Sequence, residues 1–219
     1  MKGYMKEKEA RKLICEIGRR MYEKGFVAAN DGNISIRTGG DEMICTPSGV
    51  SKGFMKEYQL VKTDLEGKPV DSGEDFNVNC GSLSISTAHV KRPVPSSEIR
   101  LHGAIYQKNP KLRAVVHAHP PISTAFAVSG LSLEEAFMTE SLAVLGPIPL
   151  APYAPAGTEE LAQNAAAFCL SHKGVLLANH GAATWSENPL EAWYLMESLE
   201  HSAKIYLHAK YILGNVNFL

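Results

Sequence analysis

Two histidines stand two positions apart: His117 lies in the apolar segment 114–118, and His119 directly follows that segment. Along a strand, side chains at positions i and i+2 point to the same face, so both imidazoles can reach one ion. Imidazole nitrogen is a preferred ligand for zinc and similar divalent ions. Two histidines on a solvated strand face explain this segment equally well, so a metal site requires further ligands.

A third histidine closes another apolar run, which extends from Gly174 to Asn179 and is followed by His180 and Gly181. Such a run predicts a buried strand whose polar end emerges at an edge or in a pocket. Glycine at position 181 leaves room for backbone or ligand to approach closely. Because an open catalytic zinc site usually has three protein ligands plus water or substrate, the three histidines form a candidate set.

A carboxylate candidate is Glu98, which follows Ser96 and Ser97. Either serine can cap a helix that ends at Asn109 and carries the apolar residues Ile99, Leu101, Ile105 and Tyr106. This predicts Glu98 in the first helical turn, where a negative charge suits the positive helix end. Two interpretations remain open: an acid that only serves the helix, or an oxygen ligand of the metal.

Three short segments have the residue types that approach anions: Gly32-Asn33, Ser48-Gly49 and Ser96-Ser97. Their backbone N–H groups and small side chains can contact a phosphate, and the last pair stands at a predicted helix N-terminus. Each segment is also compatible with an ordinary turn or cap. Lys52 could add positive charge, although its spacing does not require it.

Length and composition favour one domain and limit the classes of partner. The 219 residues contain no linker or internal repeat and suffice for a substantial core. With 22 basic and 23 acidic residues, a net charge of -1 predicts neither nucleic-acid nor anionic-membrane binding. The N-terminal segment lacks the apolar core of a signal peptide, and no stretch is long enough to span a bilayer, so we expect a cytoplasmic enzyme. The four cysteines lie far apart and predict neither a zinc knuckle nor a disulfide framework.

Apolar periodicity predicts interleaved helices and strands. We expect helices over 10–21, from Thr158 to about Leu170, and from Asn188 to about Leu207. Strands are expected over 32–38 and 43–46, with a hairpin turn between them. This alternation indicates an α/β layered domain.

Segment 74–92 fits neither the helical nor the strand period, because it is polar and rich in small residues. We interpret it as a surface excursion, such as an added hairpin. Its position just ahead of Ser96 leaves a second interpretation, in which it shapes substrate choice or a subunit contact. We assign no metal role to His89 within it.

The order of five short motifs resembles the class II aldolase family, which includes fuculose-phosphate aldolase and ribulose-phosphate 4-epimerase. The motifs are Gly32-Asn33-Ile34-Ser35, Thr46-Pro47-Ser48-Gly49, Ser96-Ser97-Glu98, His117-Ala118-His119 and Asn179-His180-Gly181. Any one would be weak, but five in the family's order, spanning about residues 10 to 210, are specific. The resemblance implies a single domain over 1–219, with an α/β/α arrangement of three layers, a central mixed, mostly antiparallel sheet, and an insertion at about 74–92.

The resemblance also implies a site and a reaction. One zinc ion per subunit, or another divalent metal, is expected on His117, His119, His180 and Glu98. The phosphate of a sugar phosphate is expected at Asn33, Ser48, Gly49, Ser96 and Ser97. The implied enzyme is a metal-dependent aldolase that cleaves fuculose 1-phosphate, or a related deoxyketose phosphate, to dihydroxyacetone phosphate and an aldehyde. Zinc would stabilise the enediolate, and Glu98 would act as the base, best served by a raised pKa. A homotetramer with active sites at subunit interfaces is implied as well.

The aldehyde end of the implied site departs from fuculose-phosphate aldolase. The tyrosine expected to protonate the aldehyde oxygen falls near Met138, and no tyrosine follows Tyr211 to match that enzyme's C-terminal tail. Tyr153 or Tyr106 could substitute, although each also fits the core.

Alternatives therefore remain open. One is a 4-epimerase, which typically has aspartate where this chain has Glu98, and another is a decarboxylase of a keto sugar-acid phosphate. A third is a scaffold like the adducin head domain, which has lost its metal ligands; retention of the three histidines argues against it.

Overall fold

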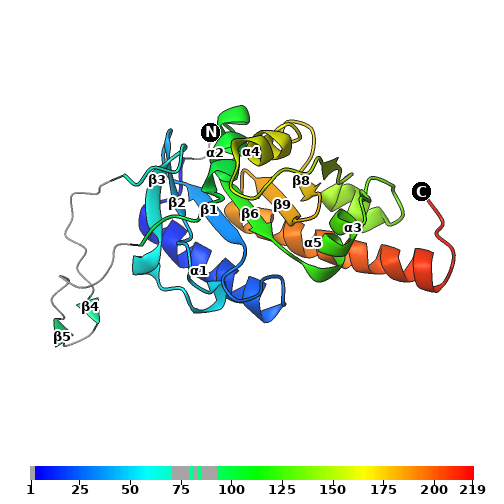
Figure 1. Cartoon of the computed structure of the whole chain (residues 1–219), viewed down its shortest axis with the longest axis horizontal. Helices are drawn as coiled ribbons and strands as arrows, with labels where there is room; N and C mark the ends of the chain where they lie inside the picture. The colour runs from blue at the N-terminus through cyan, green and yellow to red at the C-terminus, as the bar shows by residue number, and fades with distance from the viewer. Residues whose placement is uncertain (1–2, 71–78, 81–82, 85–92) are drawn as a thin grey trace.

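A seven-stranded sheet forms the centre of the computed structural model, which describes residues 3–70, 79–80, 83–84 and 93–219 (Figure 1). Its strands lie in the order β3-β2-β1-β6-β9-β8-β7, and every neighbouring pair is antiparallel except the parallel β7–β8 pair. The prediction of a mixed, mostly antiparallel sheet is confirmed. The strand bounds are β1 Asn33–Arg37, β2 Glu42–Cys45, β3 Val61–Asp64, β6 Ala114–Ala118, β7 Leu150–Ala151, β8 Gly174–Leu177 and β9 Gly181–Ser186.

Helices cover both faces of this sheet, which gives the three layers that the resemblance implied. One hydrophobic cluster packs α1, α3 and α5 against one face, and a second packs α2 and α4 against the other (Figure 1). Alternate residues of a strand supply the two clusters: Val116 belongs to the first and Val115 to the second. The helix bounds are α1 Glu7–Glu23, α2 Ile99–Lys108, α3 Pro121–Val128, α4 Glu159–Ala166 and α5 Pro189–Leu207.

The helix signals in the sequence have clear counterparts in the structure. Gly25, just beyond α1, has φ 69°, a conformation that glycine adopts without strain. Thr158 accepts a hydrogen bond from the Leu161 N–H at the start of α4, and Asn188 accepts one from the Leu190 N–H at the start of α5. Helix α4 ends earlier than predicted, and the sequence analysis missed α3, β3 and β9.

The tight hairpin between β8 and β9 brings His180 to the end of β6. Asn179 in its turn has φ 57°, and Gly181 pairs with Leu177 across the hairpin. A Cβ atom on Gly181 would lie 2.6 Å from both Ala118 O and His119 Cδ2. Glycine is therefore required for this close approach, as its position in the sequence suggested.

The expected insertion at 74–92 lies mostly outside the described residues, as does His89. Within it, β4 (Asn79–Cys80) pairs antiparallel with β5 (Leu83–Ser84). Cys45 and Cys169 are buried and Cys15 is half-buried, and all three are free thiols. Among the described residues, no helix combines the length and apolarity needed to cross a bilayer.

Candidate metal centre

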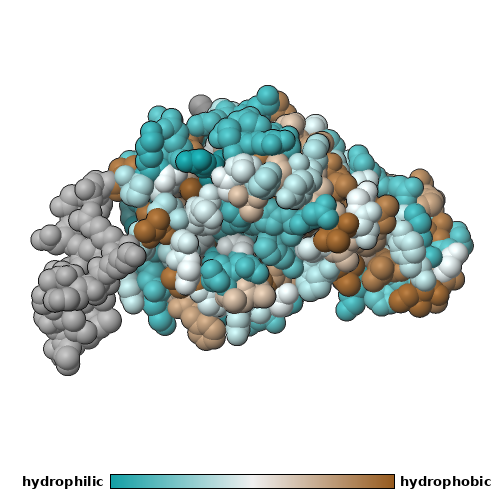
Figure 2. Space-filling model, in the orientation of Figure 1, coloured by the Kyte–Doolittle hydropathy of each residue, from teal (hydrophilic) through white to brown (hydrophobic). Residues whose placement is uncertain are grey.

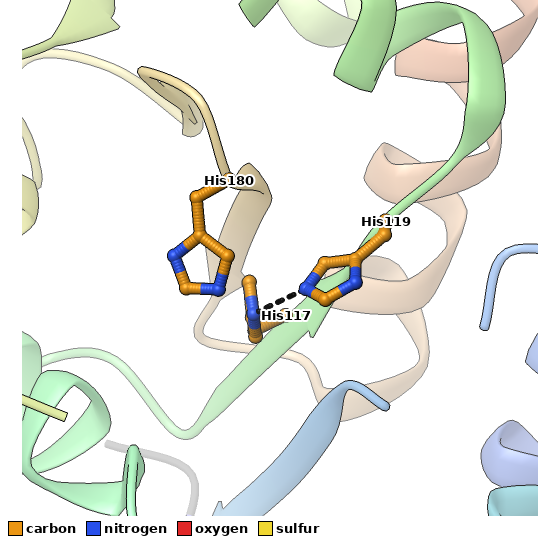
Figure 3. Close-up of side chains that lie close together, drawn as sticks. All are labelled: His117, His119 and His180. Carbon is orange, nitrogen blue, oxygen red and sulfur yellow. Dashed lines mark hydrogen bonds between the residues drawn. The ribbon is translucent and has the colours of Figure 1, made fainter. Parts of the chain in front are cut away.

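Three imidazoles meet where β6 ends and the β8–β9 hairpin turns (Figure 3). His117 is the penultimate residue of β6, His119 directly follows that strand, and His180 lies in the hairpin turn. One ligand nitrogen from each ring lies within 4.8 Å of the other two. His117 Nε2 and His119 Nε2 are 3.2 Å apart. The structure thus brings together the three histidines that the sequence analysis selected.

The carbonyl of Ala182 fixes the protonation of His117. His117 Nδ1 lies 2.9 Å from Ala182 O, and because a carbonyl only accepts, Nδ1 carries the proton and donates it. In the neutral ring the Nε2 lone pair then faces the other two imidazoles. This is the tautomer that a metal-ligating histidine needs.

The environment of His119 also favours a neutral ligand. Burial, followed by the neighbouring His117 and His180, lowers the pKa of His119 to about 4. On its other side, Asp31 Oδ2 lies 3.6 Å from His119 Nδ1. A carboxylate behind a metal-ligating imidazole orients the ring and raises its basicity.

Glu98 extends its carboxylate into the histidine cluster. Oε2 lies 3.4 Å from His117 Nε2, and Oε1 lies 3.1 Å from His180 Nε2. The side chain is 13 % exposed, so it is largely protected from water. The structure therefore supports the interpretation of Glu98 as a site residue over that of a plain helix acid.

The predicted local position of Glu98 was wrong by one residue. Helix α2 begins at Ile99, so Glu98 occupies its N-cap position instead of its first turn. Neither serine caps the helix through the predicted hydrogen bond, although Ser96 Oγ lies 3.4 Å from the Glu98 N–H. The carboxylate turns toward the histidines instead of back to the helix, because its partners lie there.

The pKa of Glu98 also differs from the raised value that would best serve a base. Burial raises the pKa of this carboxyl, but the neighbouring His117 and His180 act in the opposite direction and outweigh it. The net pKa lies well below the ordinary value of glutamate. Glu98 is therefore a carboxylate at neutral pH, able to accept a proton or to ligate a cation.

The candidate phosphate segments lie side by side. Pro47 and Pro95 form an isolated bridge, and the N–H of Ser96 donates to Thr46 O at 3.2 Å. The Ser48 N–H donates to Val94 O at 2.8 Å. The structure thus brings the Ser48-Gly49 and Ser96-Ser97 segments together. The N–H groups of Ser48 and Ser96 were expected to face an anion, but both already donate to backbone carbonyls.

Asn33 lies deeper than a simple phosphate ligand would. Its side chain is buried, and its Nδ2 donates to Glu98 Oε2 at 2.9 Å and approaches Ser96 Oγ at 3.4 Å. Gly49 and Ser97 are both exposed, and Gly49 has φ 71°. The phosphate assignments of these residues and of Ser48 and Ser96 remain predictions.

The two tyrosines considered for the aldehyde end occupy different environments. Tyr106 is fully buried and hydrogen-bonded to Ser35, as expected of a core residue. Tyr153 is 61 % exposed, so the expectation that it packs in the core was wrong. It follows the short edge strand β7, where no helix layer covers it.

Sequence reasoning missed Asp31 and His102 near the site, and it named Lys52 as a possible positive charge without foreseeing its burial. Lys52 is buried, donates to Asn30 O at 2.7 Å and Val50 O at 2.9 Å, and thereby joins the loop before β1 to the loop after β2. Burial lowers the pKa of Lys52 to about 8, although Asp31 and Glu98 act against this shift. A buried lysine in a polar turn gives no periodic signal, so only the tertiary structure revealed it.

The donor set fits a divalent metal ion. His117 directs an unprotonated nitrogen toward His119 Nε2 and Glu98 Oε2, so electron pairs converge without an intervening cation. His180 also retains a buried Nδ1 with no hydrogen-bond partner among the described residues. Three imidazoles and one carboxylate match the ligands of zinc in open catalytic sites. The residues could therefore hold a metal ion.

Comparison with known proteins agrees with this geometry. Residues 12–207 match the family described as Class II Aldolase and Adducin N-terminal domain. A 3-oxo-tetronate 4-phosphate decarboxylase of Haemophilus influenzae is 28% identical over 200 residues, covering 90% of this chain and 86% of that protein. An L-fuculose phosphate aldolase of Methanococcus maripaludis is 30% identical over 203 residues, covering 93% of this chain and 95% of the relative.

A solved structure is similar to this chain in both fold and sequence. An L-fuculose 1-phosphate aldolase superimposes with a TM-score of 0.81 at 30% sequence identity, covering 96% of this chain and 90% of that chain. Sequence and fold thus agree along nearly the whole length. The chain belongs to the class II aldolase and adducin family.

Proposed function

We propose that this protein is a zinc-dependent aldolase that cleaves a ketose 1-phosphate, such as fuculose 1-phosphate or a related deoxyketose phosphate. The products would be dihydroxyacetone phosphate and an aldehyde. The observation that carries the proposal is the position of Glu98, whose two carboxylate oxygens lie 3.4 and 3.1 Å from His117 and His180. A proton-transfer group and a metal-ligand group thus share one largely buried site.

The three imidazoles would hold the ion, and Glu98 would complete its coordination before substrate arrives. A divalent ion bound there would act as a Lewis acid that stabilises negative charge on the carbonyl and adjacent hydroxyl oxygens of the substrate. The nearby Lys52 Nζ donates to the carbonyls of Asn30 and Val50, and Lewis-acid stabilisation of an enediolate requires no Schiff-base lysine.

Glu98 would handle the proton at the reacting carbon. In cleavage the C4 hydroxyl loses its proton and becomes the aldehyde carbonyl, while the electron pair of the C3–C4 bond passes into an enediolate. C3 must then gain one proton, which balances the proton lost from the C4 hydroxyl. Protonated Glu98 would give that proton in cleavage, and the carboxylate would remove it in synthesis. Asn33 holds Oε2 through the hydrogen bond from its Nδ2, which leaves Oε1 toward His180 as the oxygen for this transfer.

A second candidate is supported by the relatives named 3-oxo-tetronate 4-phosphate decarboxylase. Loss of CO₂ from such a 3-oxo acid breaks the bond between C1 and C2 and leaves an enediolate of dihydroxyacetone phosphate. The same carbon then takes a proton. The two reactions therefore share the proton transfer by Glu98 and differ in the group that leaves.

The test is to incubate the metal-loaded protein separately with fuculose 1-phosphate and with 3-oxo-tetronate 4-phosphate. Dihydroxyacetone phosphate would be followed by its NADH-dependent reduction, with aldehyde and CO₂ measured in parallel. We expect dihydroxyacetone phosphate together with an aldehyde. His201→Ala, a change at an exposed histidine of α5, is the matched control for His117→Ala.

Release of CO₂ from the keto acid, without cleavage of the ketose, would replace the aldolase assignment by the decarboxylase. No dihydroxyacetone phosphate from either compound would overturn both.

A further inference from the structure

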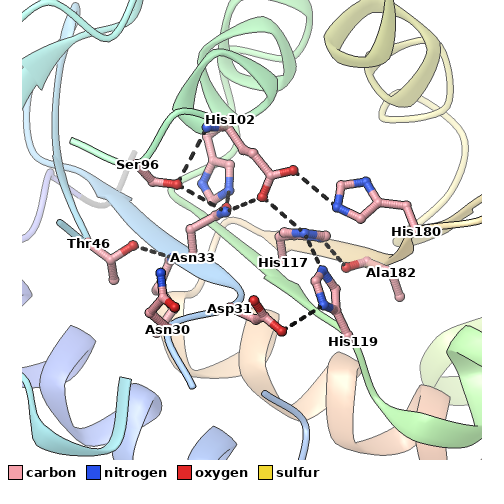
Figure 4. Close-up of polar contacts among 12 residues, drawn as sticks. Asn30, Asp31, Asn33, Thr46, Ser96, His102, His117, His119, His180 and Ala182 are labelled. Atoms are coloured by element: carbon pink, nitrogen blue, oxygen red, sulfur yellow. Dashed lines mark hydrogen bonds and ion pairs between the residues drawn. The ribbon is translucent and has the colours of Figure 1, made fainter. Parts of the chain in front are cut away.

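A fourth histidine, His102 on α2, lies beside Asn33 without belonging to the metal cluster (Figure 4). It is fully buried, and both ring nitrogens have partners. Nε2 lies 2.5 Å from Asn33 Oδ1, and Nδ1 lies 2.7 Å from Ser35 Oγ. Asn33 in turn contacts Glu98 Oε2 at 2.9 Å. The ring is thus two hydrogen bonds away from the carboxylate.

The carboxylate end of this network sets the direction of its hydrogen bonds. Asn33 Nδ2 lies 2.9 Å from Glu98 Oε2 and donates to it, so the NH₂ group of Asn33 faces the carboxylate. The amide oxygen of Asn33 then faces His102, whose Nε2 must carry the proton. A flipped amide would place oxygen against carboxylate in a buried site and leave both without a donor.

The other end of the network is consistent with this direction. If Nε2 of His102 carries the proton, Nδ1 must accept one in the neutral ring. Ser35 Oγ can donate it when the single Tyr106 hydroxyl proton points to that oxygen, 2.8 Å away, and not to Ser35 O at 3.1 Å. Every polar atom in this row then has a partner of the correct polarity.

The ring is also held in the required charge state. Burial, followed by the neighbouring His117, lowers the pKa of His102 to about 3. His102 is therefore neutral across the physiological range, with one proton to place on Nδ1 or Nε2. The choice between the two nitrogens decides which way the Asn33 amide points.

We propose that His102 is a positioning residue: its Nε2 proton locks the Asn33 amide so that Asn33 Nδ2 orients the Glu98 carboxylate for proton transfer. The role in proton transfer rests on the proposed function, whereas the tautomer and the amide orientation do not. The hydrogen-bond partners of the His102 ring are Asn33 and Ser35, and neither is one of the four candidate metal ligands. It acts only through Asn33.

The first test measures the tautomer directly. Long-range proton–nitrogen NMR spectra of protein labelled with ¹⁵N-histidine distinguish protonation at Nε2 from protonation at Nδ1. We expect the Nε2-protonated form for His102 in the wild-type protein, identified by loss of its signals in His102→Gln. The Nδ1-protonated form, or a doubly protonated ring at neutral pH, would overturn the proposal even if the enzyme proved inactive.

The second test separates positioning from packing. His102→Phe keeps a planar ring but lacks the donor, so solvent exchange of the carbon-bound proton of dihydroxyacetone phosphate should fall by roughly 10- to 100-fold, as for other outer-shell partners. Metal content and dihydroxyacetone phosphate binding should stay near wild type. His102→Gln retains an N–H donor and should recover most of the lost rate.

Trp185→Phe is the matched control, because it removes a part-buried hydrogen bond, from Trp185 Nε1 to His172 O at 2.7 Å, at a residue in the hydrophobic cluster that α2 also joins. It should lower stability without changing the exchange rate. Wild-type exchange in a folded, metal-loaded His102→Phe protein would contradict positioning. Absence of exchange in the wild-type protein would count against the proposed function and leave the tautomer result to decide the role of His102.

Discussion

Asn33 on β1 and His117 on β6 are direct partners in the antiparallel register of the sheet. Side chains of such a pair lie on the same face, about 5 Å apart at Cβ. Both reach Glu98 Oε2: the Asn33 amide at 2.9 Å and the His117 imidazole at 3.4 Å. A shift of one residue in this register would turn either side chain to the opposite face, so the β1–β6 pairing determines the geometry of the carboxylate.

Metal content gives the most direct prediction. We expect about one divalent ion per chain, because an open zinc site has three protein ligands. His117→Ala, His119→Ala and His180→Ala should each lose most of the ion, measured by elemental analysis after dialysis. His201→Ala should keep it. Full metal content in all three cluster variants would show that the ion binds elsewhere.

Glu98→Gln should separate binding from proton transfer. The three imidazoles are unchanged, so the variant should still bind zinc and dihydroxyacetone phosphate. Exchange of the carbon-bound proton with D₂O should fall by at least roughly 100-fold, since general bases typically contribute ~10²- to 10⁴-fold. The measurement is NMR of the substrate. Near-normal exchange in the metal-loaded variant would assign the base to another residue.

Asp31→Asn should weaken metal binding without removing a ligand. Its carboxylate lies 3.6 Å from His119 Nδ1, and loss of such an outer partner typically costs about 10- to 100-fold in metal affinity or activity. Competition with a chelator would measure the affinity. Asp41→Asn, a change at an exposed aspartate in the β1–β2 turn, is the control. Equal affinities in the two variants would exclude a role for Asp31.

Lys52 should make stability depend on pH above neutrality. Its pKa is about 8 in the folded protein, lowered by burial from 10.5, so the unfolded chain binds more protons between these values. Stability contributed by this residue should therefore rise as pH increases from about 8 to 10.5.

Urea unfolding at several pH values would measure this effect. Relative to Lys52→Met, the free energy of unfolding of the wild-type protein should increase by roughly 1 to 3 kcal/mol across the window. Lys8→Met, at an exposed lysine, should show the wild-type pH slope. A pH slope for Lys52→Met that matches the wild type would rule out titration of Lys52.

We also predict the oligomeric state: the family resemblance implies a homotetramer. Apolar side chains gather at the end of the molecule where α5 finishes, and Ile212 and Leu213 there are 65% and 81% exposed (Figure 2). Exposed apolar patches often mark subunit contacts. Light scattering should give the mass of four chains.

Ile212→Asp should lower that mass, whereas Leu170→Asp, at an equally exposed leucine beyond α4, should not. A monomer with full activity would contradict sites built at subunit interfaces.

Local patterns in the sequence were sufficient for several features of this protein. The spacing of His117 and His119 placed both rings on one side because side-chain direction alternates along a strand. Thr158 and Asn188 marked helix starts because capping involves residues only a few positions apart. The order of five motifs identified the family and, through it, the three-layer fold.

Other features depended on contacts between distant parts of the chain. Glu98 was placed in a helical turn by its local sequence, but His117 and His180 draw its carboxylate into the site. Asp31 gave no recognisable signal because its partner His119 lies far from it in the sequence, directly after β6.

The sequence by itself thus determined which residue types could bind a metal, their relative spacing on β6, and the family of the chain. The tertiary structure alone decided the direction of the Glu98 carboxylate, the burial of Lys52, and the row of hydrogen bonds through Asn33 and His102. The physical reason is that periodicity and capping report interactions between near neighbours. Hydrogen-bond direction and desolvation are instead set by groups that only folding brings together.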